Sequence, residues 1–414
     1  MINQTKEKAL KDAVLGLRDW AENLLARLVA VPTVNPPGRE YPRLVAELGA
    51  VMEELGISLQ VLFPTEAEVR RLYPESEGLP RPNLVGHLRL GREKTLHLNG
   101  HYDVVPPGEG WTRDPFVLGR DGEWLRGRGA GDMKGAIVAQ LAALAALKKI
   151  GLEPSCNLEF GYVPDEESGG ACGLGWLIRR DVLKADAGLF EGHSGPALTI
   201  ANKGVLWLEI EVRGRSGHAS RPYEGVNAFA GAVAVARGLL DAAHQLCEKK
   251  SDLPVARPED ARGVMTLGGK IASATQKVNV IPGKVSFTVD RRLLPEEDPQ
   301  RVQAEIEARA REALPEVEGL SITVRRLQLA PAVVCNADSE IVRALADALE
   351  KVYGQKPPRQ LSAFFTDMRF MEKMPCCGHS VRSQGIHGPD EGVHRGDLLD
   401  TALAVALLCA TFGA

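Results

Sequence analysis

The sequence lacks several features that mark whole classes of protein. Its seven cysteines include no CxxC pair, and only Cys376 and Cys377 are neighbours, so we expect reduced thiols and not a disulfide framework. Lys and Arg total 50 against 54 Asp and Glu, which is not the basic excess that binding to nucleic acid phosphates requires. The segment GRGAGDMKG lacks the GxGxxG spacing, and it has no phosphate-loop GKS or GKT. We therefore expect neither a nucleic acid partner nor a nucleotide-binding enzyme.

Long apolar runs are also scarce. The longest, AIVAQLAALAAL after Gly135, contains Gln140 and stops at Lys148 and Lys149. A run of that length is shorter than a membrane span and predicts a buried core helix. The first twenty residues mix charged and apolar positions, which indicates an amphipathic helix and not a signal peptide. We expect a cytoplasmic protein with no membrane anchor.

The chain is long enough for two domains. Strand-like and helix-like segments alternate over roughly the first 200 residues, which favours an α/β sheet covered by helices. From about Lys203 the pattern changes to β-α-β-α-β, the order of a small α+β module, and from about Pro331 two helices return to the first sheet. The sequence therefore predicts a discontinuous α/β domain of residues 1–201 and 330–414, interrupted by an inserted domain of residues 202–329.

Residues that can bind metals follow several predicted strands. KTLHLNG leads directly into His101 and Asp103, and the carboxyl edge of an open α/β sheet is where ligands bind. Asp132 lies in the glycine-rich turn of GRGAGDMKGA before a helix, where small residues let the backbone approach a ligand. Taken singly, these residues could equally be a hydrogen-bonded loop pair and a helix N-cap.

Three further segments add the same kinds of side chain. The strand NLEFGYV ends at a run of three carboxylates that includes Glu166 and Glu167, DAGLF ends at Glu191, and GIHGPDEGVH supplies His387. A solvated acidic turn is the simple interpretation of the carboxylate run alone. Five strand ends, turns or loops that deliver two imidazoles and three carboxylates favour a metal site over coincidence.

Together these motifs resemble the zinc aminoacylase family, which includes acetylornithine deacetylase, succinyl-diaminopimelate desuccinylase, aminoacylase and glutamate carboxypeptidase. The resemblance covers essentially the whole chain. It implies a zinc-peptidase-like α/β catalytic domain with an inserted α+β lid or dimerisation domain. It also implies cleavage of the amide of an N-acyl amino acid by metal-activated water. The motifs that carry it are GHYDVVP at 100–106, GRGAGDMKGA at 127–136, PDEESGG at 164–170, SGHASRP at 216–222 and GIHGPDEG at 385–392.

The resemblance implies two Zn²⁺ ions, for which Co²⁺ or Mn²⁺ are alternatives. One zinc would be bound by His101, Asp132 and Glu191, and the other by Asp132, Glu167 and His387. Three protein ligands for each ion leave positions open, as in catalytic zinc sites. Glu166 would then be the general base, and Asp103 would fix the tautomer of His101. A cis peptide bond between Asp132 and Met133 is implied as well.

The inserted domain would complete the site. The resemblance implies that His218 enters the active site of a partner subunit and stabilises the oxyanion, so a homodimer is expected. It places Asn279 and Arg292 at the substrate carboxylate, with Arg291 as the neighbouring alternative, because only one of two adjacent strand residues can face the cleft. Thr366 would face the substrate, a small N-acyl amino acid or short peptide.

Two departures from the family pattern leave alternatives open. Glu191 precedes Gly192 and His193 where the family usually has proline, so His193 or Asp186 could assist or replace it. Phe364 and Phe365 stand where glycines often precede the Thr or Ser. At least one ring could narrow the acyl pocket and disfavour a succinyl chain, or both could pack in the core.

Two other functions fit the same motifs. A carboxypeptidase or dipeptidase attacks an amide in the same way as a deacylase. A metal-binding sensor or scaffold on the same fold would not hydrolyse anything, although such a protein would be expected to have lost the base or a ligand.

Overall fold

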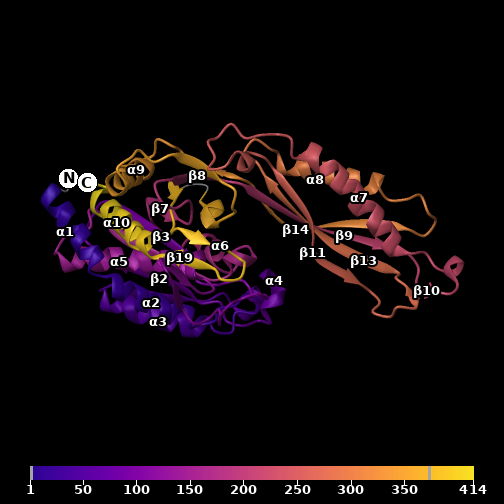
Figure 1. Ribbon diagram of the computed structural model, residues 1–414, viewed down its shortest axis with the longest axis horizontal. Coiled ribbons are helices and arrows are strands. Elements are labelled where there is room, and N and C mark those ends of the chain that lie inside the picture. The colour runs from indigo at the N-terminus through magenta and orange to yellow at the C-terminus, as the bar shows by residue number, and fades with distance from the viewer. Residues whose placement is uncertain (1–2, 372–373) are drawn as a thin grey trace. The chain divides into compact units, whose positions relative to one another are not determined.

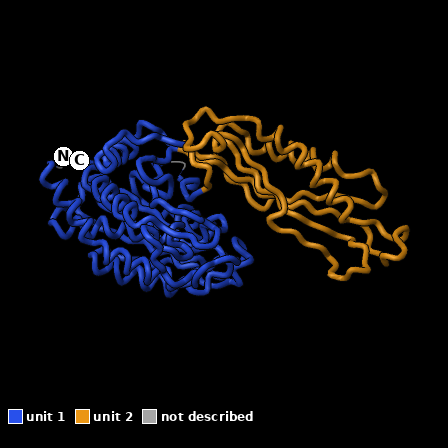
Figure 2. The backbone as a smooth tube through the Cα atoms, in the orientation of Figure 1, with its two compact units in different colours: residues 1–200, 335–360, 366–414 blue, residues 201–334, 361–365 orange. Residues whose placement is uncertain are grey.

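The computed structural model describes residues 3–371 and 374–414, which form two compact units (Figure 2). The predicted insert, 202–329, lies inside unit 2. Ala201, residues 330–334 and residues 361–365, which the prediction gave to the other domain, also belong to unit 2. Residues 361–365 join it through the backbone, since Lys203 N–H donates to Ser362 O and Leu361 N–H to Pro254 O. Unit 1 comprises Met1–Ile200, Cys335–Gln360 and Thr366–Ala414, and unit 2 comprises Ala201–Val334 and Leu361–Phe365.

A mixed sheet forms the centre of unit 1, in the order β1-β2-β6-β3-β7-β17-β8. Strands β6, β3, β7 and β17 run parallel to one another. The pairings β1-β2, β2-β6 and β17-β8 are antiparallel. The short β17 was not predicted, because three residues carry no readable alternation. The strands are β1 (Ser58–Leu62), β2 (Asn83–Leu88), β3 (Thr95–His101), β6 (Asn157–Val163), β7 (Ala187–Phe190), β8 (Leu198–Asn202) and β17 (Cys376–Gly378).

Helices cover this sheet and share one large apolar cluster with it (Figure 1). A smaller cluster lies under α6 and contains Val163, Leu177 and Phe190. The helices of the large cluster are α1 (Gln4–Leu15), α2 (Arg18–Val29), α3 (Tyr41–Glu54), α5 (Gly135–Lys149), α9 (Glu340–Tyr353) and α10 (Arg395–Thr411), while α4 (Glu66–Leu72) and α6 (Leu174–Arg179) are short.

The apolar helix α5 begins at Gly135, where the sequence indicated. The turn Ala130–Lys134 leads into it, but Asp132 and Met133 there have non-helical backbone angles, with φ −127° and −128°. Counted together with this turn, the segment Ala130–Lys149 has the length and composition of a membrane span. However, 94% of its apolar window is buried inside the fold. A core helix that packs on all sides needs no polar face, which explains its composition.

A small sheet joins two segments that are far apart in the sequence. Its order is β18-β19-β5-β4, and the register pairs Gly392 with Arg126. The segment before Asp132 therefore lies beside the segment after His387. The strands are β4 (Gly119–Asp121), β5 (Trp124–Arg126), β18 (Ser383–Gln384) and β19 (Gly392–His394).

Unit 2 is an antiparallel sheet in the order β11-β13-β9-β14, packed against α7 and α8. The predicted order β-α-β-α-β is wrong by one strand, since β11 makes it β-α-β-β-α-β. The register of β11 shifts between Leu267 and Ile271, and Gly268 there has φ +84°, so the expected alternation is interrupted. The elements are β9 (Gly204–Arg213), β10 (Gly217–His218), α7 (Ala228–Leu246), β11 (Val264–Ser273), β12 (Val280–Ile281), β13 (Lys284–Leu293), α8 (Pro299–Glu312), β14 (Ser321–Ala330), β15 (Val333–Val334) and β16 (Arg359–Ser362), which begins in unit 1.

Candidate metal centre

Parallel pairing brings three predicted site segments of unit 1 to one sheet edge. His101 is the last residue of β3 and pairs with Val163, the last residue of β6. Strand β7 pairs with the other side of β3 and ends at Phe190, one residue before Glu191. Because neighbouring strands lie about 4.8 Å apart, side chains that follow these strands meet in a small volume.

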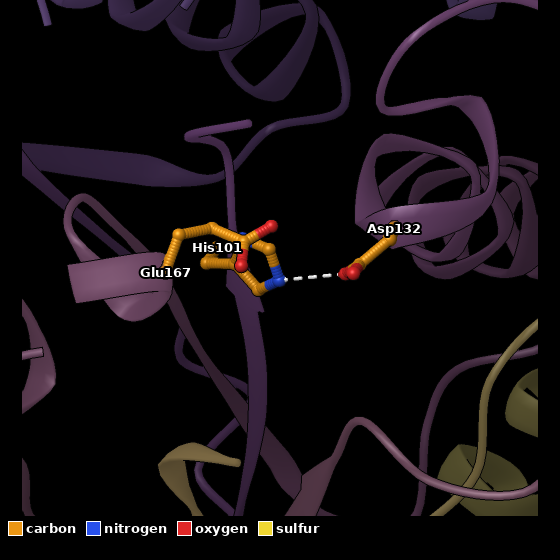
Figure 3. Close-up of side chains that lie close together, drawn as sticks. All are labelled: His101, Asp132 and Glu167. Carbon is orange, nitrogen blue, oxygen red and sulfur yellow. Dashed lines mark hydrogen bonds and ion pairs between the residues drawn. The ribbon is translucent and has the colours of Figure 1, made fainter. Parts of the chain in front are cut away.

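Asp132 lies between two histidines. Its Oδ1 is 3.0 Å from His101 Nε2, and its Oδ2 is 3.3 Å from His387 Nε2. His387 Nε2 is also 3.1 Å from the Glu167 carboxylate. Figure 3 shows His101, Asp132 and Glu167 converging from a strand, a helix start and a turn, and their ligand atoms lie within 4.8 Å of one another. Each oxygen of Asp132 thus faces a different imidazole, which suits a carboxylate shared by two ions.

The backbone is unusual at this centre. His387 has φ +61° and Asp165, directly before Glu166, has φ +64°. Left-handed backbone at a residue other than glycine is uncommon and costs of order 1 kcal/mol or more, and such residues cluster at functional sites. The peptide bond between Asp132 and Met133 is cis, as the family resemblance implied.

The electrostatics of the centre fit a bound cation. Burial and the charge of Asp132 raise the pKa of Glu167. Burial also acts to raise the pKa of Asp132, but His101 and His387 outweigh it and lower that pKa. Crowded buried carboxylates repel one another unless a positive charge lies among them. A set of two imidazoles and several carboxylates is a suitable donor set for zinc and similar divalent metals.

Glu191 belongs to the same cluster. It is half-buried, and its pKa is raised well above the usual value by burial and by the charges of Asp132, Glu166 and Glu167. One alternative ligand, Asp186, lies beside the start of β3. Asp186 accepts the backbone N–H of Thr95 at 2.8 Å, at the opposite end of β3 from His101.

The other alternative, His193, is held by a threonine. Its backbone N–H donates to Thr199 Oγ1 at 2.8 Å, and its Nδ1 lies 2.7 Å from the same hydroxyl. This contact engages Nδ1 of the ring, as Asp103 does for His101, so it does not eliminate His193. Glu191 stays the predicted third ligand because its carboxyl group interacts electrostatically with Asp132 and Glu167.

Asp103 is buried behind His101. His101 Nδ1 lies 3.1 Å from the Asp103 carbonyl and 3.4 Å from its carboxylate. With Nδ1–H donating to Asp103, Nε2, which faces Asp132, is the nitrogen that could bind a metal. Burial acts to lower the pKa of His101, but Asp103 and Asp132 outweigh it and raise that pKa well above the usual value.

Glu166, the predicted base, is buried beside the cluster. Arg369 Nη1 donates to its carboxylate at 3.3 Å, and Arg369 lies 3.5 Å from Asp367 in turn. Burial raises the pKa of Glu166 to about 8. A carboxyl group with a pKa near neutrality is suited to both taking and giving a proton.

The sequence analysis missed a buried ion pair that touches this centre. Arg128 Nη1 donates to Glu391 Oε2 at 2.5 Å, and both side chains are 1% exposed. Both residues occur in motifs quoted for the resemblance, GRGAGDMKGA and GIHGPDEG. An Arg and a Glu, each four residues from a predicted ligand, were the available signal in the sequence, but their pairing spans 263 residues.

In unit 2 the predicted site residues divide into two groups. His218 in β10 pairs with Val280 in β12, and Ala219 N–H donates to Asn279 O at 3.0 Å, so His218 and Asn279 are neighbours, and both are exposed. Arg292 lies near the other end of β13, eight residues beyond Lys284, which corresponds to roughly 26 Å of strand.

The two adjacent arginines of β13 face opposite sides of the strand. Arg291 is buried, and its guanidinium donates to Glu297 at 2.6 Å and to Leu246 O at 3.0 Å. Arg292 is partly exposed and pairs with both carboxylate oxygens of Asp290, at 2.9 and 3.0 Å. Of these two arginines, Arg292 is therefore the one whose guanidinium group a substrate could reach.

The segment that contains Thr366 is only partly open. Thr366 is buried, and its hydroxyl accepts the backbone N–H of Met368 at 3.3 Å. Phe364 is 59% exposed and Phe365 is half-buried. The Phe364 ring therefore does not pack in the core of this chain, so the alternative in which both rings are core residues is wrong. Contact of Thr366 with the substrate stays a prediction.

Comparison with known proteins places this geometry in context. The sequence profile described as Peptidase family M20/M25/M40 matches residues 97–411. An uncharacterized metallohydrolase of Methanococcus maripaludis is 30% identical over 307 residues, which cover 68% of this chain and 72% of that protein. A succinyl-diaminopimelate desuccinylase of Methylobacterium radiotolerans is 28% identical over 92% of this chain and 93% of its own. The crystal structure of human carnosine dipeptidase 1 superposes with a TM-score of 0.79 at 18% identity, covering 98% of each chain.

Proposed function

The chain belongs to Peptidase family M20/M25/M40, and from that premise we propose that it is a metal-dependent amidohydrolase that cleaves the amide of an N-acyl amino acid. The observation that carries the proposal is the carboxylate of Asp132 held between His101 and His387, with Glu166 buried close by. A desuccinylase similar over nine tenths of the chain supports an acyl amino acid as substrate.

The residues that would hold the metals are those that the family resemblance implies, and the contacts of Asp132 with His101 and His387 support them. We assign His101, Asp132 and Glu191 to one zinc and Asp132, Glu167 and His387 to the other. When bound, such ions make a water molecule a stronger nucleophile and polarise an amide carbonyl. Asp103 would keep His101 Nε2 free for its ion, because Nδ1–H donates to Asp103.

Glu166 would act as the general base. It would take a proton from the attacking water and pass the proton to the leaving nitrogen. Its burial and raised pKa support this role, since a base works best when its pKa lies near the working pH. Arg369, which donates to Glu166, would orient the carboxylate.

We propose that the enzyme works as a homodimer through unit 2. His218 in β10 pairs with β12, just before β13 begins, whereas Arg292 lies roughly 26 Å along β13 from its first residue, Lys284, so we infer that one copy of unit 2 does not present both to one small substrate. A partner subunit would supply His218 to stabilise the oxyanion, and Asn279 would accompany it.

An exposed apolar surface supports this assembly. Phe229, Val233 and Leu240 of α7 are all more than half exposed, and their spacing places them on one side of the helix. Strand β11 is an edge strand of its sheet, with Ile271 70% exposed. Exposed edges and apolar helix faces are commonly covered by association.

Arg292 would bind the substrate carboxylate, since a guanidinium offers two parallel donors to a carboxylate. Phe364, being exposed, would contact the acyl group and favour apolar or aromatic acyl groups over succinyl. Thr366 would contribute to the same pocket.

The test is release of free amine from N-acetyl, N-succinyl and N-aromatic-acyl amino acids and from dipeptides, with added Zn²⁺, Co²⁺ or Mn²⁺ and with a chelator. We expect chelator-sensitive turnover that is fastest on apolar N-acyl amino acids. Faster cleavage of dipeptides would replace the proposal with a dipeptidase. If metal-loaded protein released no amine from any compound, the proposal would fail in favour of a metal-binding protein without hydrolytic activity.

A further inference from the structure

The ion pair of Arg128 and Glu391 joins the two loops that carry Asp132 and His387. Arg128 lies four residues before Asp132, and Glu391 lies four residues after His387. The small sheet brings these segments together, since Gly127 N–H donates to Glu391 O at 2.8 Å. Both charged side chains are fully enclosed, and a buried charge costs stability unless it is paired and hydrogen-bonded.

The Glu391 carboxylate holds the backbone of the metal-binding turn. Its Oε1 accepts hydrogen bonds from the backbone N–H groups of Gly129, Gly131 and Asp132, each at 3.0 Å. Successive N–H groups that converge in this way form a concave anion-binding nest. Asp132 therefore has its own backbone N–H fixed while its side chain points at the two histidines.

The turn is shaped to admit this carboxylate. A Cβ at Gly131 would lie 2.7 Å from Ser383 Cβ, 3.2 Å from Gly392 O and 3.4 Å from Glu391 Oε1. Any larger residue at this position would push the two loops apart. The glycine is thus required by close packing of the turn against the Glu391 segment.

Arg128 extends the same contact to the other loop. Its Nη2 donates to Gly388 O at 3.2 Å, directly after His387, and to Pro107 O at 3.2 Å. A single ion pair therefore touches the backbone at Asp132 and the backbone beside His387. Neither Arg128 nor Glu391 is among the predicted ligands.

We propose that Arg128 and Glu391 are positioning residues: they hold the Asp132 carboxylate and the His387 imidazole close enough together to bind the same metal ion. This inference rests on the proposed function in taking Asp132 and His387 as ligands. Residues that orient ligands commonly change metal affinity by roughly 10- to 100-fold when they are altered.

The test compares Glu391→Gln with Glu297→Gln. The glutamine side chain has the size of the Glu391 side chain. Its NH₂ group would face either the backbone N–H donors or Arg128, where an acceptor is needed. Glu297 is a matched control, because it forms the equally buried ion pair with Arg291, at 2.6 Å, in unit 2, to which none of the predicted metal ligands belongs. Metal-free proteins are titrated with Zn²⁺ against a chromophoric chelator, without substrate.

We expect the dissociation constant for Zn²⁺ to rise roughly 10- to 100-fold in Glu391→Gln and to stay at the wild-type value in Glu297→Gln. Wild-type affinity in Glu391→Gln, or an equal loss in both variants, would overturn the proposal. If Glu391→Gln does not fold, Arg128→Lys serves instead, since it keeps the charge but loses the forked donor. It should weaken Zn²⁺ binding, and unchanged binding would overturn the proposal. Because no turnover is measured, a failure of the proposed hydrolysis leaves this result interpretable.

Discussion

The backbone N–H of Glu166 donates to the Asp103 carboxylate over 3.2 Å. The other oxygen of Asp103 accepts the backbone N–H of Glu167 at 3.2 Å and the side-chain amide of Asn35 at 2.9 Å. The resemblance assigned Asp103 to His101 alone. In the structure, one carboxylate also holds the turn that carries the predicted base and a predicted ligand.

This arrangement predicts the effect of Asp103→Asn. The amide would point an NH₂ group at one of the donors, so the turn and the His101 tautomer would both lose their fixed position. We expect Zn²⁺ affinity to fall roughly 10- to 100-fold, together with kcat. Chelator competition and steady-state kinetics at saturating Zn²⁺ measure the two effects separately. If neither Zn²⁺ affinity nor kcat changed, Asp103 would be no more than a buried structural residue.

Glu166→Gln separates the base from the ligands. The side chain keeps its size but can no longer take a proton. We expect kcat to fall roughly 10²- to 10⁴-fold, while the metal content, determined by elemental analysis, stays that of the wild type. Full turnover in a metal-loaded Glu166→Gln protein would refute the assignment, and loss of metal would show that Glu166 is a ligand instead.

Mixed dimers test whether His218 acts across subunits. His218→Ala and Glu166→Gln should each be nearly inactive. When the two are unfolded and refolded together in equal amounts, half of the dimers are mixed, and each mixed dimer has one site with both residues intact. Activity should return to about a quarter of the wild-type value for a two-fold symmetric dimer. No recovery, with mixed dimers demonstrated by mass, would place His218 in the site of its own subunit, and full activity of the His218→Ala dimer alone would place it outside the mechanism.

We predict that the buried side chain of His379 makes the free energy of unfolding depend on pH. It is 3% exposed, its Nδ1 lies 3.1 Å from Ala197 O, and burial lowers its pKa to about 4. In the unfolded chain its pKa is about 6.5. The unfolded state therefore binds the proton first, and stability is lost as the pH falls from 6.5 toward 4, by about 3 kcal/mol in total.

His379→Asn keeps a donor for Ala197 O but does not titrate. We expect the variant to be less stable than the wild type at pH 7 and to lose less stability on acidification. Urea unfolding of metal-free protein from pH 7 to pH 4 measures this. Parallel losses in both proteins would show that His379 protonates equally well in the folded state.

The sequence was sufficient for the strands β3, β6 and β7, whose apolar runs end at turn residues. It was also sufficient to predict the family, because GHYDVVP, PDEESGG and GIHGPDEG are short motifs that can be recognised without knowing which residues they contact in the fold. In unit 2, alternation along β13 showed that only one of Arg291 and Arg292 could face outward. It could not show β11, since the glycines near Ile271 interrupt the alternation on which strand prediction depends.

Other features were decided by the tertiary structure alone. Arg128 and Glu391 are separated by 263 residues, and only the pairing of β5 with β19 brings them together. The contacts of Asp103 with the turn at Glu166 likewise depend on parallel pairing of β3 with β6. Sequence patterns report the local periodicity of burial and the presence of chemical groups. Which buried charge meets which backbone donor depends on strand order and register, and those are fixed only when the sheets assemble.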